Sequence, residues 1–157
     1  MESVEFGSLA GLRAVVTGST SGIGRAIAKA FALAGADLII HGARNTVSAE
    51  AFATELRLLG RRAVVVMTDL GDAGSLTCFV DRCWDELGGI DIWVNNAGVD
   101  LLTGDAARLS FDDKLQRLYE VDVRCTLLLS RLVGRRMQAL GTGTILNIGW
   151  DQAERGM

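Results

Sequence analysis

The chain has 157 residues, of which 49% are hydrophobic, and a formal net charge of −3 at pH 7. This length is sufficient for one domain with a sizeable buried core. The charge balance lacks the basic excess of nucleic-acid-binding proteins, and no apolar run has the length of a membrane span. The acidic start at residues 1–7 is unlike a signal peptide. We therefore expect a cytoplasmic protein without nucleic-acid or membrane partners.

The cysteines and the single histidine argue against metal chemistry. Cys78, Cys83 and Cys125 have no metal-ligand spacing, and we expect all three to be small, buried or half-buried apolar residues. His41 follows a short apolar run and is expected to be a hydrogen-bonded residue at a strand end. The sequence therefore predicts neither a zinc site nor a histidine-based catalytic triad.

After a lead-in at 1–11, the first predicted elements are a strand at 13–17 and a helix at 22–34 that ends at Gly35. Between them lies the turn Thr-Gly-Ser-Thr-Ser-Gly-Ile-Gly at 17–24. Such a turn leaves the amides at the helix N-terminus unpaired, and the positive end of the helix dipole faces outward. An anionic phosphate is the expected occupant of this position.

Each glycine of this turn has a physical reason. Gly18 leaves the strand in a turn that a Cβ would hinder, Gly22 lets a pyrophosphate approach the backbone, and Gly24 lets the helix pack closely on the strand. The spacing G-x-x-x-G-x-G differs from the common dinucleotide fingerprint G-x-G-x-x-G. Glycine spacing alone therefore leaves an ordinary loop as an alternative.

The rest of the chain continues to alternate between strands and helices. Asp72 is the expected N-cap of the third helix, and Ser110, followed by Asp113 three residues later, predicts a capping box for the fourth. A polar loop precedes that fourth helix. The remaining predicted strands are at 37–41, 63–67, 90–94 and 144–148, and the remaining helices are at 47–59, 73–87 and 111–139.

This alternation predicts an α/β fold of the Rossmann-like kind, with three layers (helix, sheet, helix) and one parallel sheet. The expected strand order is 3-2-1-4-5, with a switch point between strands 1 and 4. Ligands of such sheets bind at the carboxyl ends of the strands beside that switch. The glycine turn and Asn-Asn-Ala-Gly at 95–98 both fall there, so we expect the binding site at this edge.

With these residues placed, the chain resembles the short-chain dehydrogenase/reductase family. Four motifs occur in the family's order at the expected element ends. They are the T-G-x-x-x-G-I-G turn at 17–24, Asp69-Leu70 after the third strand, N-N-A-G at 95–98, and Gly-Thr-Ile-Leu-Asn-Ile at 143–148. The resemblance implies that 1–157 is a single NAD(P)-binding Rossmann domain, the amino-terminal part of such an enzyme.

The resemblance also implies the residues that contact the cofactor, although each could instead have a purely structural role in its turn. Asn95 would tie the sheet together, and 99–109 would border the substrate. The implied cofactor-binding residues are Gly18, Ser21, Gly22, Ile23 and Gly24 at the pyrophosphate, Asp69 with Leu70 at the adenine, and Asn96, Ala97 and Gly98 at the ribose and nicotinamide.

The end of the second strand bears on the choice of cofactor. An acid about 20 residues past the glycines would bind the ribose 2′-hydroxyl of NAD, whereas an arginine accommodates the 2′-phosphate of NADP. The sequence at 41–45 is His-Gly-Ala-Arg-Asn, so Arg44 favours NADP, with NAD as the alternative. Relatives that prefer NADP often have a second basic residue in the glycine turn, where this chain has Ser-Thr-Ser at 19–21. A solvated surface arginine is the other interpretation.

The family's catalytic residues have no match in this chain. The family uses a tyrosine as general acid or base with a lysine four residues later, and the chain ends at Met157 before any Y-x-x-x-K. Tyr119, the only tyrosine, is expected to be a partly buried helix residue. The assisting asparagine aligns with Asp122, and the serine aligns with Trp150, or with Asp151 after a shift of one residue. An ionised carboxylate at the serine position would repel a developing oxyanion.

Two functions are consistent with these observations. The first is the NADP(H)-binding part of an oxidoreductase, truncated before its catalytic pair, that when complete transfers hydride between nicotinamide and an unknown carbonyl or alcohol. The second is a non-catalytic NADP(H)-binding or interaction module. We also expect a homo-oligomer, because apolar residues of the 111–139 helix extend beyond one face and that helix meets a partner subunit in the family. The strand at 144–148 would form an unpaired apolar edge.

Overall fold

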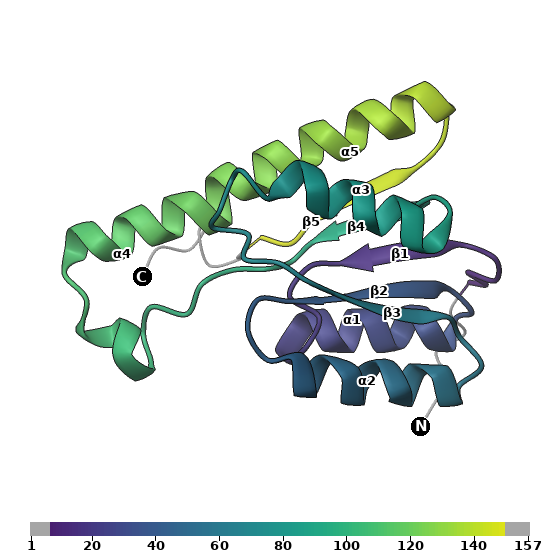
Figure 1. Ribbon diagram of the computed structural model, residues 1–157, viewed down its shortest axis with the longest axis horizontal. Helices are drawn as coiled ribbons and strands as arrows, with labels where there is room; N and C mark the ends of the chain where they lie inside the picture. The colour runs from purple at the N-terminus through teal and green to yellow at the C-terminus, as the bar shows by residue number, and fades with distance from the viewer. Residues whose placement is uncertain (1–6, 150–157) are drawn as a thin grey trace.

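The computed structural model describes residues 7–149, which form a parallel sheet with helices on both faces (Figure 1). The strands are β1 (Arg13–Val16), β2 (Asp37–Gly42), β3 (Ala63–Met67), β4 (Ile92–Asn95) and β5 (Thr144–Asn147). They are hydrogen-bonded in the order β3-β2-β1-β4-β5, and every pairing is parallel. This order confirms the predicted topology and places the switch point between β1 and β4.

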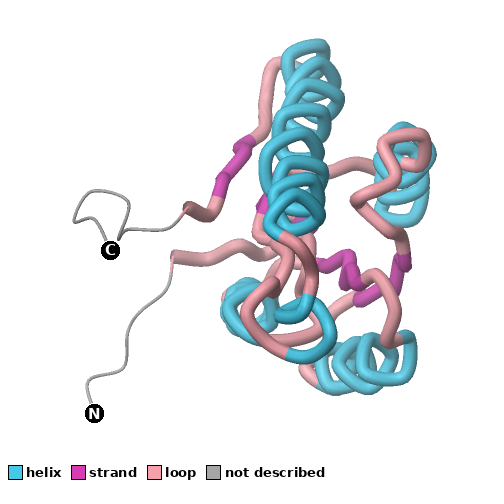
Figure 2. The backbone as a smooth tube through the Cα atoms, turned by 90° about the vertical axis from the view of Figure 1, so that its left-hand side faces the viewer, coloured by secondary structure: helices cyan, strands magenta, loops and turns pink. Residues whose placement is uncertain are grey.

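The helices form one layer on each side of the sheet, as the view along the strands shows (Figure 2). They are α1 (Gly22–Leu33), α2 (Thr46–Leu58), α3 (Leu76–Leu87), α4 (Phe111–Leu118) and α5 (Thr126–Leu140), with the 3₁₀ helix η1 (Gly104–Arg108) before α4 and the π-helical segment η2 (Tyr119–Cys125) between α4 and α5. Helices α1 and α2 cover one face and α3 and α5 the other, whereas α4 projects past the sheet (Figure 1). Within the described part of the chain, none of these helices combines the length and the apolar character that a bilayer crossing needs.

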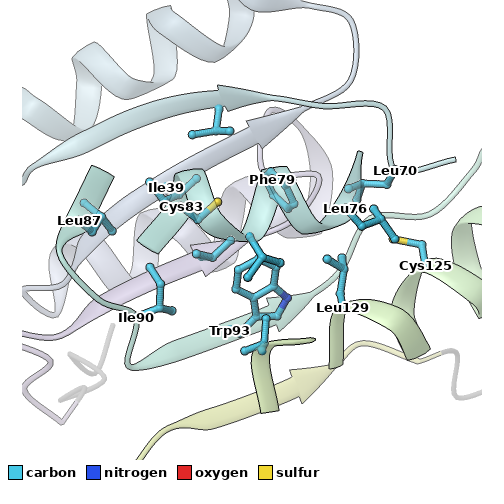
Figure 3. Close-up of a cluster of buried hydrophobic side chains, with 14 of the residues drawn as sticks. Ile39, Leu70, Leu76, Phe79, Cys83, Leu87, Ile90, Trp93, Cys125 and Leu129 are labelled. Carbon is cyan, nitrogen blue, oxygen red and sulfur yellow. The ribbon is translucent and has the colours of Figure 1, made fainter. Parts of the chain in front are cut away.

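The sheet divides the hydrophobic core in two, because successive side chains of a strand point to opposite faces. Ala14 and Val16 of β1 pack toward α1 and α2, whereas Val15 packs toward α3 and α5. Trp93 lies at the centre of the second cluster with its ring fully buried (Figure 3). Its Nε1–H donates a hydrogen bond to Asn95 Oδ1 at 2.8 Å, so burial of the indole leaves no unpaired donor.

The beginning of the third helix differs from the prediction. Asp72 accepts a hydrogen bond from Gly74 N–H at 2.9 Å, and this local turn replaces the expected cap. The Ser75 hydroxyl also bonds backward, to the Asp72 carbonyl oxygen at 2.8 Å, and α3 begins only at Leu76. The predicted cap was therefore wrong, because the short polar side chains satisfy the turn before the helix instead of the helix itself.

The long helix predicted at 111–139 is present, but η2 interrupts it. Its start agrees with the prediction, since Ser110 Oγ accepts from Asp113 N–H at 3.1 Å. The second bond differs from that of a capping box, because the Asp113 carboxylate accepts from the Ser110 hydroxyl, at 2.7 Å. The π-helical segment has wider turns than an α-helix and changes which residues face the core. The 3₁₀ helix η1 also occupies part of the predicted polar loop.

Two side chains are more exposed than expected. Cys83 and Cys125 are buried, but Cys78 is exposed because it lies on the outer face of α3. Tyr119 exposes 53% of its surface, because it lies at the junction of α4 and η2 beyond the edge of the sheet. The expectation of a buried or half-buried side chain was therefore wrong for Cys78, whereas Tyr119 lies in a helical segment as expected but is more exposed than a partly buried residue.

Candidate functional site

A cleft of about 830 Å³ opens at the carboxyl ends of β1 and β4, beside the switch point. Its volume is within the range of sites that hold a small molecule or cofactor. The glycine turn, the ends of β2 and β3, the segment after β4, and parts of α4 and η2 form its walls. Every residue predicted to contact the cofactor lines this cleft: Gly18, Ser21, Gly22, Ile23, Gly24, Arg44, Asp69, Leu70, Asn96, Ala97 and Gly98.

The glycine turn presents the N-terminus of α1 to the cleft. Gly18 and Gly22 have φ values of +65° and +54°, a left-handed backbone that favours glycine. Ser21 is the N-cap residue, yet within residues 7–149 its side chain makes no capping hydrogen bond. In the same part of the chain, and apart from the two chain neighbours of Gly22 and the nearby backbone of α1, no atom lies within 4 Å of the position that a Cβ at Gly22 would take. The first amides of α1 are therefore available to an anion in the cleft.

The turn packs directly against the segment that follows β4. A Cβ at Gly18 would lie 3.0 Å from Ala97 Cα, and one at Gly24 would collide with the Gly18 carbonyl oxygen and the Asn96 amide. Thr17 Oγ1 accepts hydrogen bonds from the N–H groups of Asn96 at 2.9 Å and Ala97 at 3.0 Å. Asn96 Nδ2 in turn donates to the Thr17 carbonyl oxygen at 3.0 Å. These contacts join the two walls of the cleft at the switch point.

Asn95 links β4 to the elements beside it, as the resemblance implied. Its Nδ2 donates to Asn147 Oδ1 of β5 at 2.8 Å and to Ser130 Oγ of α5 at 3.0 Å. Its Oδ1 accepts from Trp93, so the whole amide is engaged. This side chain supports the cleft from behind and does not line it.

Asp69 and Leu70 form the wall of the cleft at the end of β3. Asp69 is exposed, and its Oδ1 accepts from Gly71 N–H at 2.9 Å, which keeps the carboxylate in a fixed turn. Leu70 is buried in the same core cluster as Trp93 (Figure 3). Leu70 therefore anchors this wall to the core, while Asp69 places a negative charge at its rim.

The end of β2 forms the next wall and carries a positive charge. Arg44 is exposed on the loop after β2. A Cβ at Gly42 would lie 2.7 Å from Thr20 Cγ2, so Thr20 occupies the space that a side chain at the end of β2 would need. The residues at 41–45 include no acid, and Arg44 is the charged group of this segment.

His41, which was not predicted to belong to the site, also lines the cleft. The side chain is only 2% exposed; Gly18 N–H donates to its Nδ1 at 3.0 Å, and its Nε2 lies 3.1 Å from the Thr68 carbonyl oxygen. Burial lowers the pKa of His41 to about 4, although the Thr68 carbonyl acts in the opposite direction. The expectation of a hydrogen-bonded strand-end residue is confirmed. The sequence indicated this role because His41 follows a short apolar run.

Part of the cleft comes from the second half of the described chain. Arg117 of α4 and Val121 of η2 line it, together with Asp100 and Leu101 from the segment after β4. The motifs gave no indication of Arg117 or Val121, because their position depends on how the long helix crosses the end of the sheet.

The residues that align with the family's assisting asparagine and serine lie beside the cleft or outside the described residues. Asp122 of η2 is half-buried, and its Oδ1 accepts from Val99 N–H at 3.1 Å. Burial raises the pKa of Asp122, whereas the bond from Val99 acts to lower it. Trp150 and Asp151 lie outside the described residues. Tyr119 is not among the residues that line the cleft in the described part of the chain.

Comparison with known proteins is consistent with this geometry. The family profile described as short chain dehydrogenase matches residues 13–157. Gluconate 5-dehydrogenase from Gluconobacter oxydans (strain 621H) is 31% identical over 156 residues, covering 98% of this chain and 59% of the relative. The chain spans about half the length of the curated relatives that it matches, from 46% to 59%.

Solved structures show the same arrangement. The structure of a short chain dehydrogenase from Burkholderia cenocepacia J2315 in complex with NADP has a TM-score of 0.81 and 35% identity, over 95% of this chain and 59% of that one. A 7α-hydroxysteroid dehydrogenase complexed with NADH and 7-oxo glycochenodeoxycholic acid has a TM-score of 0.82 and 34% identity, over 94% of this chain and 56% of that one. The chain therefore belongs to the short-chain dehydrogenase/reductase family.

Proposed function

We propose that the chain binds a nicotinamide dinucleotide in the cleft, with NADP(H) preferred over NAD(H), as the cofactor-binding part of an oxidoreductase. The complete enzyme would transfer hydride between the nicotinamide and a small carbonyl or alcohol substrate. The observation that carries the proposal is the N-terminus of α1, which has no side-chain cap within residues 7–149 and faces a cleft of cofactor size. Relatives whose structures hold NADP or NADH support it.

The residues of the cleft fit such a ligand. The amides at the start of α1 and the open space at Gly22 suit a pyrophosphate, because unpaired N–H groups and the helix dipole both attract its negative charge. Leu70 offers an apolar surface and Asp69 a hydrogen-bond acceptor to the adenine. Ala97 and Gly98 are small enough to let the ribose and nicotinamide lie against the backbone after β4. When bound, the nicotinamide would supply the hydride chemistry, and the chain's own residues would bind and orient it.

The preference for NADP(H) rests on the end of β2. A carboxylate there would bind the 2′-hydroxyl of NAD and repel a 2′-phosphate. At this position Gly42 has no side chain, and Thr20 takes the space beside it. Arg44 supplies a guanidinium that can form charge-assisted hydrogen bonds to the phosphate.

A titration of the purified chain with NADPH and with NADH, followed by nicotinamide fluorescence, tests the proposal. NADPH should bind more tightly, and Arg44→Ala should weaken NADPH by about tenfold or more while changing NADH little, because a charge-assisted bond contributes about 1.5–3 kcal/mol. Arg131→Ala is the matched control, since Arg131 is an exposed arginine on α5 away from the cleft. If neither nucleotide binds, the proposal is wrong. Equal affinity for NADPH and NADH would contradict only the proposed preference for NADP(H).

A second candidate function is a non-catalytic NADP(H)-binding or interaction module. Its support is that Asp122 stands where the family has an asparagine and that Tyr119 is absent from the lining of the cleft in the described part of the chain. NADPH binding without reduction of any carbonyl compound, together with a partner that copurifies at a fixed ratio, would favour this function. Measurable turnover by the pure chain would exclude it.

Three further parts of the proposal concern the whole protein. We place it in the cytoplasm, where its three free cysteines would stay reduced. Burial raises the pKa of two of these thiols, Cys83 and Cys125, which keeps them protonated and unreactive. Residues 1–157 are proposed to belong to one nucleotide-binding domain. A homo-oligomer is proposed from the exposed apolar residues of α4.

A further inference from the structure

The His41 side chain bridges two segments of the cleft that are distant in sequence. Its Nδ1 accepts from the backbone N–H of Gly18 in the glycine turn, and its Nε2 bonds to the carbonyl oxygen of Thr68 at the end of β3. The backbone of His41 also holds the turn, because its carbonyl accepts from Ser19 N–H and its N–H donates to Ser19 Oγ, both at 2.9 Å. One residue thus connects β2 to the pyrophosphate turn and to the proposed adenine wall.

These partners determine the protonation state of the ring. Gly18 N–H is a donor, so the atom that faces it, Nδ1, must carry a lone pair. The Thr68 carbonyl is an acceptor, so Nε2 must carry the proton. The other neutral tautomer would set N–H against N–H and lone pair against lone pair, and the imidazolium would set an N–H against the Gly18 amide. Only the neutral Nε2–H tautomer satisfies both contacts.

We propose that His41, as the neutral Nε2–H imidazole, is a positioning residue that holds Gly18 and the glycine turn in the shape that receives the cofactor's pyrophosphate. This inference rests on the proposed function. Gly18 is the point where the chain leaves β1 with a positive φ, and the first amides of α1 follow it. Loss of the bond to His41 frees this amide and lets the turn move relative to the helix N-terminus.

The surroundings of the ring keep it neutral. The glycine turn, the end of β3 and α3 pack against it, and α3 contributes the ring of Phe79 with 4.8 Å between ring centroids. Asp69 at the end of β3 directs its carboxylate to Gly71 N–H. Cys83 of α3 stays protonated because burial raises its pKa, and the charged side chains of α3 are not among its buried residues. Desolvation therefore governs the pKa of His41 and lowers it.

The protonation state is testable without any nucleotide. In a long-range ¹H–¹⁵N correlation spectrum of the ¹⁵N-labelled chain, whose only histidine is His41, the ring should show the Nε2–H pattern at pH 7 and still at pH 5.5. The Gly18 amide proton should be strongly protected from exchange. A ring with its proton on Nδ1, or one that titrates near the ordinary pKa of about 6.5, would overturn the inference.

Substitutions of His41 distinguish a role in positioning the glycine turn from a role in packing alone. His41→Leu keeps an apolar side chain but removes both ring contacts, and it should weaken NADPH binding by about tenfold, as expected for one lost hydrogen bond at a binding surface. His41→Asn keeps an acceptor near the place of Nδ1 and should restore the affinity to within about threefold. His41→Gln, whose amide reaches toward Thr68 instead, is the matched control and should not restore it.

The outcomes distinguish this inference from the proposed function. If the unsubstituted chain binds NADPH and His41→Leu binds it equally well, His41 is only a packing residue and the inference is wrong. The same conclusion follows if a folded His41→Asn chain binds as weakly as His41→Leu. If the unsubstituted chain shows the Nε2–H tautomer but binds neither nucleotide, the proposed function fails and the cofactor role of His41 fails with it.

Discussion

At the scale of single residues, the hydroxyl of Thr17 joins the two walls of the cleft. The side chain is 1% exposed, and its Oγ1 accepts from two backbone N–H groups, those of Asn96 and Ala97. The same hydroxyl donates to the Val94 carbonyl oxygen at 3.3 Å. All of its hydrogen-bonding capacity is therefore used at the point where β1 and β4 separate.

Thr17→Val keeps the size and branching of the side chain and removes the hydroxyl. Two N–H groups would then lose their acceptor, and we expect the free energy of unfolding to fall by about 1–3 kcal/mol. Urea denaturation followed by tryptophan fluorescence measures the change. Thr17→Ser retains the hydroxyl and is the control; it should lose less stability than Thr17→Val. Equal stability of the two variants would show that the hydrogen bonds contribute little.

His41 makes the stability of the chain depend on pH. Its pKa is about 4 when folded, because of burial, and near 6.5 when unfolded, so between these values the unfolded chain binds more protons. Stability is therefore fully present above the unfolded pKa and is lost as the pH falls toward the folded pKa. From pH 7 to pH 5 the expected loss is about 2 kcal/mol.

Urea unfolding at both pH values measures this loss, and His41→Asn is the control because it carries no titrating ring. The difference in stability between the two chains should narrow on acidification by about the same 2 kcal/mol. A constant difference from pH 7 to pH 5 would mean that His41 is not buried as a neutral ring.

At the scale of elements, the parallel strands were the most predictable feature. Each is a short apolar run between turn residues, and the observed ends lie within two residues of the predicted ones. Right-handed crossovers then limited the possible orders of the sheet, and the observed order is the one of doubly wound dinucleotide-binding folds. The positions of the glycine turn and of the segment at 95–98 were equally predictable, because each is a short motif whose neighbouring elements place it at the switch point.

The division of the long helix was not predictable in the same way. Periodicity indicates which residues are apolar, but it does not indicate where η2 widens the turn. The apolar residues of this helix consequently differ in burial: Cys125 is buried, whereas Leu115 and Leu118 are exposed. The contribution of Arg117 to the cleft depends on the same crossing of the helix over the sheet edge, which no local motif encodes.

The stability of an Asp122 variant tests whether η2 buries this carboxyl group. Its pKa is raised by burial, so its contribution to stability is present below the unfolded pKa of about 3.8 and is lost as the pH rises through the folded pKa. Asp122→Asn keeps an oxygen acceptor for Val99 N–H without the charge. We therefore expect this variant to be more stable than the unsubstituted chain at pH 7, as measured by urea unfolding.

The advantage of Asp122→Asn should disappear at acid pH, where the carboxyl group is protonated in both the folded and the unfolded chain. Asp105→Asn removes one negative charge from an exposed position in η1 and serves as the control for net charge. An equal gain from both variants would mean that overall charge, rather than the burial of Asp122, is responsible.

At the scale of the whole molecule, apolar side chains are exposed on α4 and at the edge of the sheet. Phe111 and Leu115 of α4 are 78% and 55% exposed, and α4 projects past the sheet (Figure 1). β5 is at the edge of the sheet, and Leu146 in that strand is also exposed. Exposed apolar patches and unpaired strand edges both favour association.

We accordingly expect the chain to self-associate through α4, because burial of this face in a second copy removes apolar area from water at about 25 cal/mol per Å². Sedimentation velocity over about a hundredfold range of concentration should show a rise in mass with concentration. Leu115→Glu places a charge in the proposed contact and should shift the equilibrium to monomer. Val47→Glu, at a more exposed position at the start of α2, which covers a face of the sheet, should leave it unchanged. A monomer at every concentration would exclude α4 as an interface, whereas dissociation by both variants would indicate nonspecific association through exposed apolar residues.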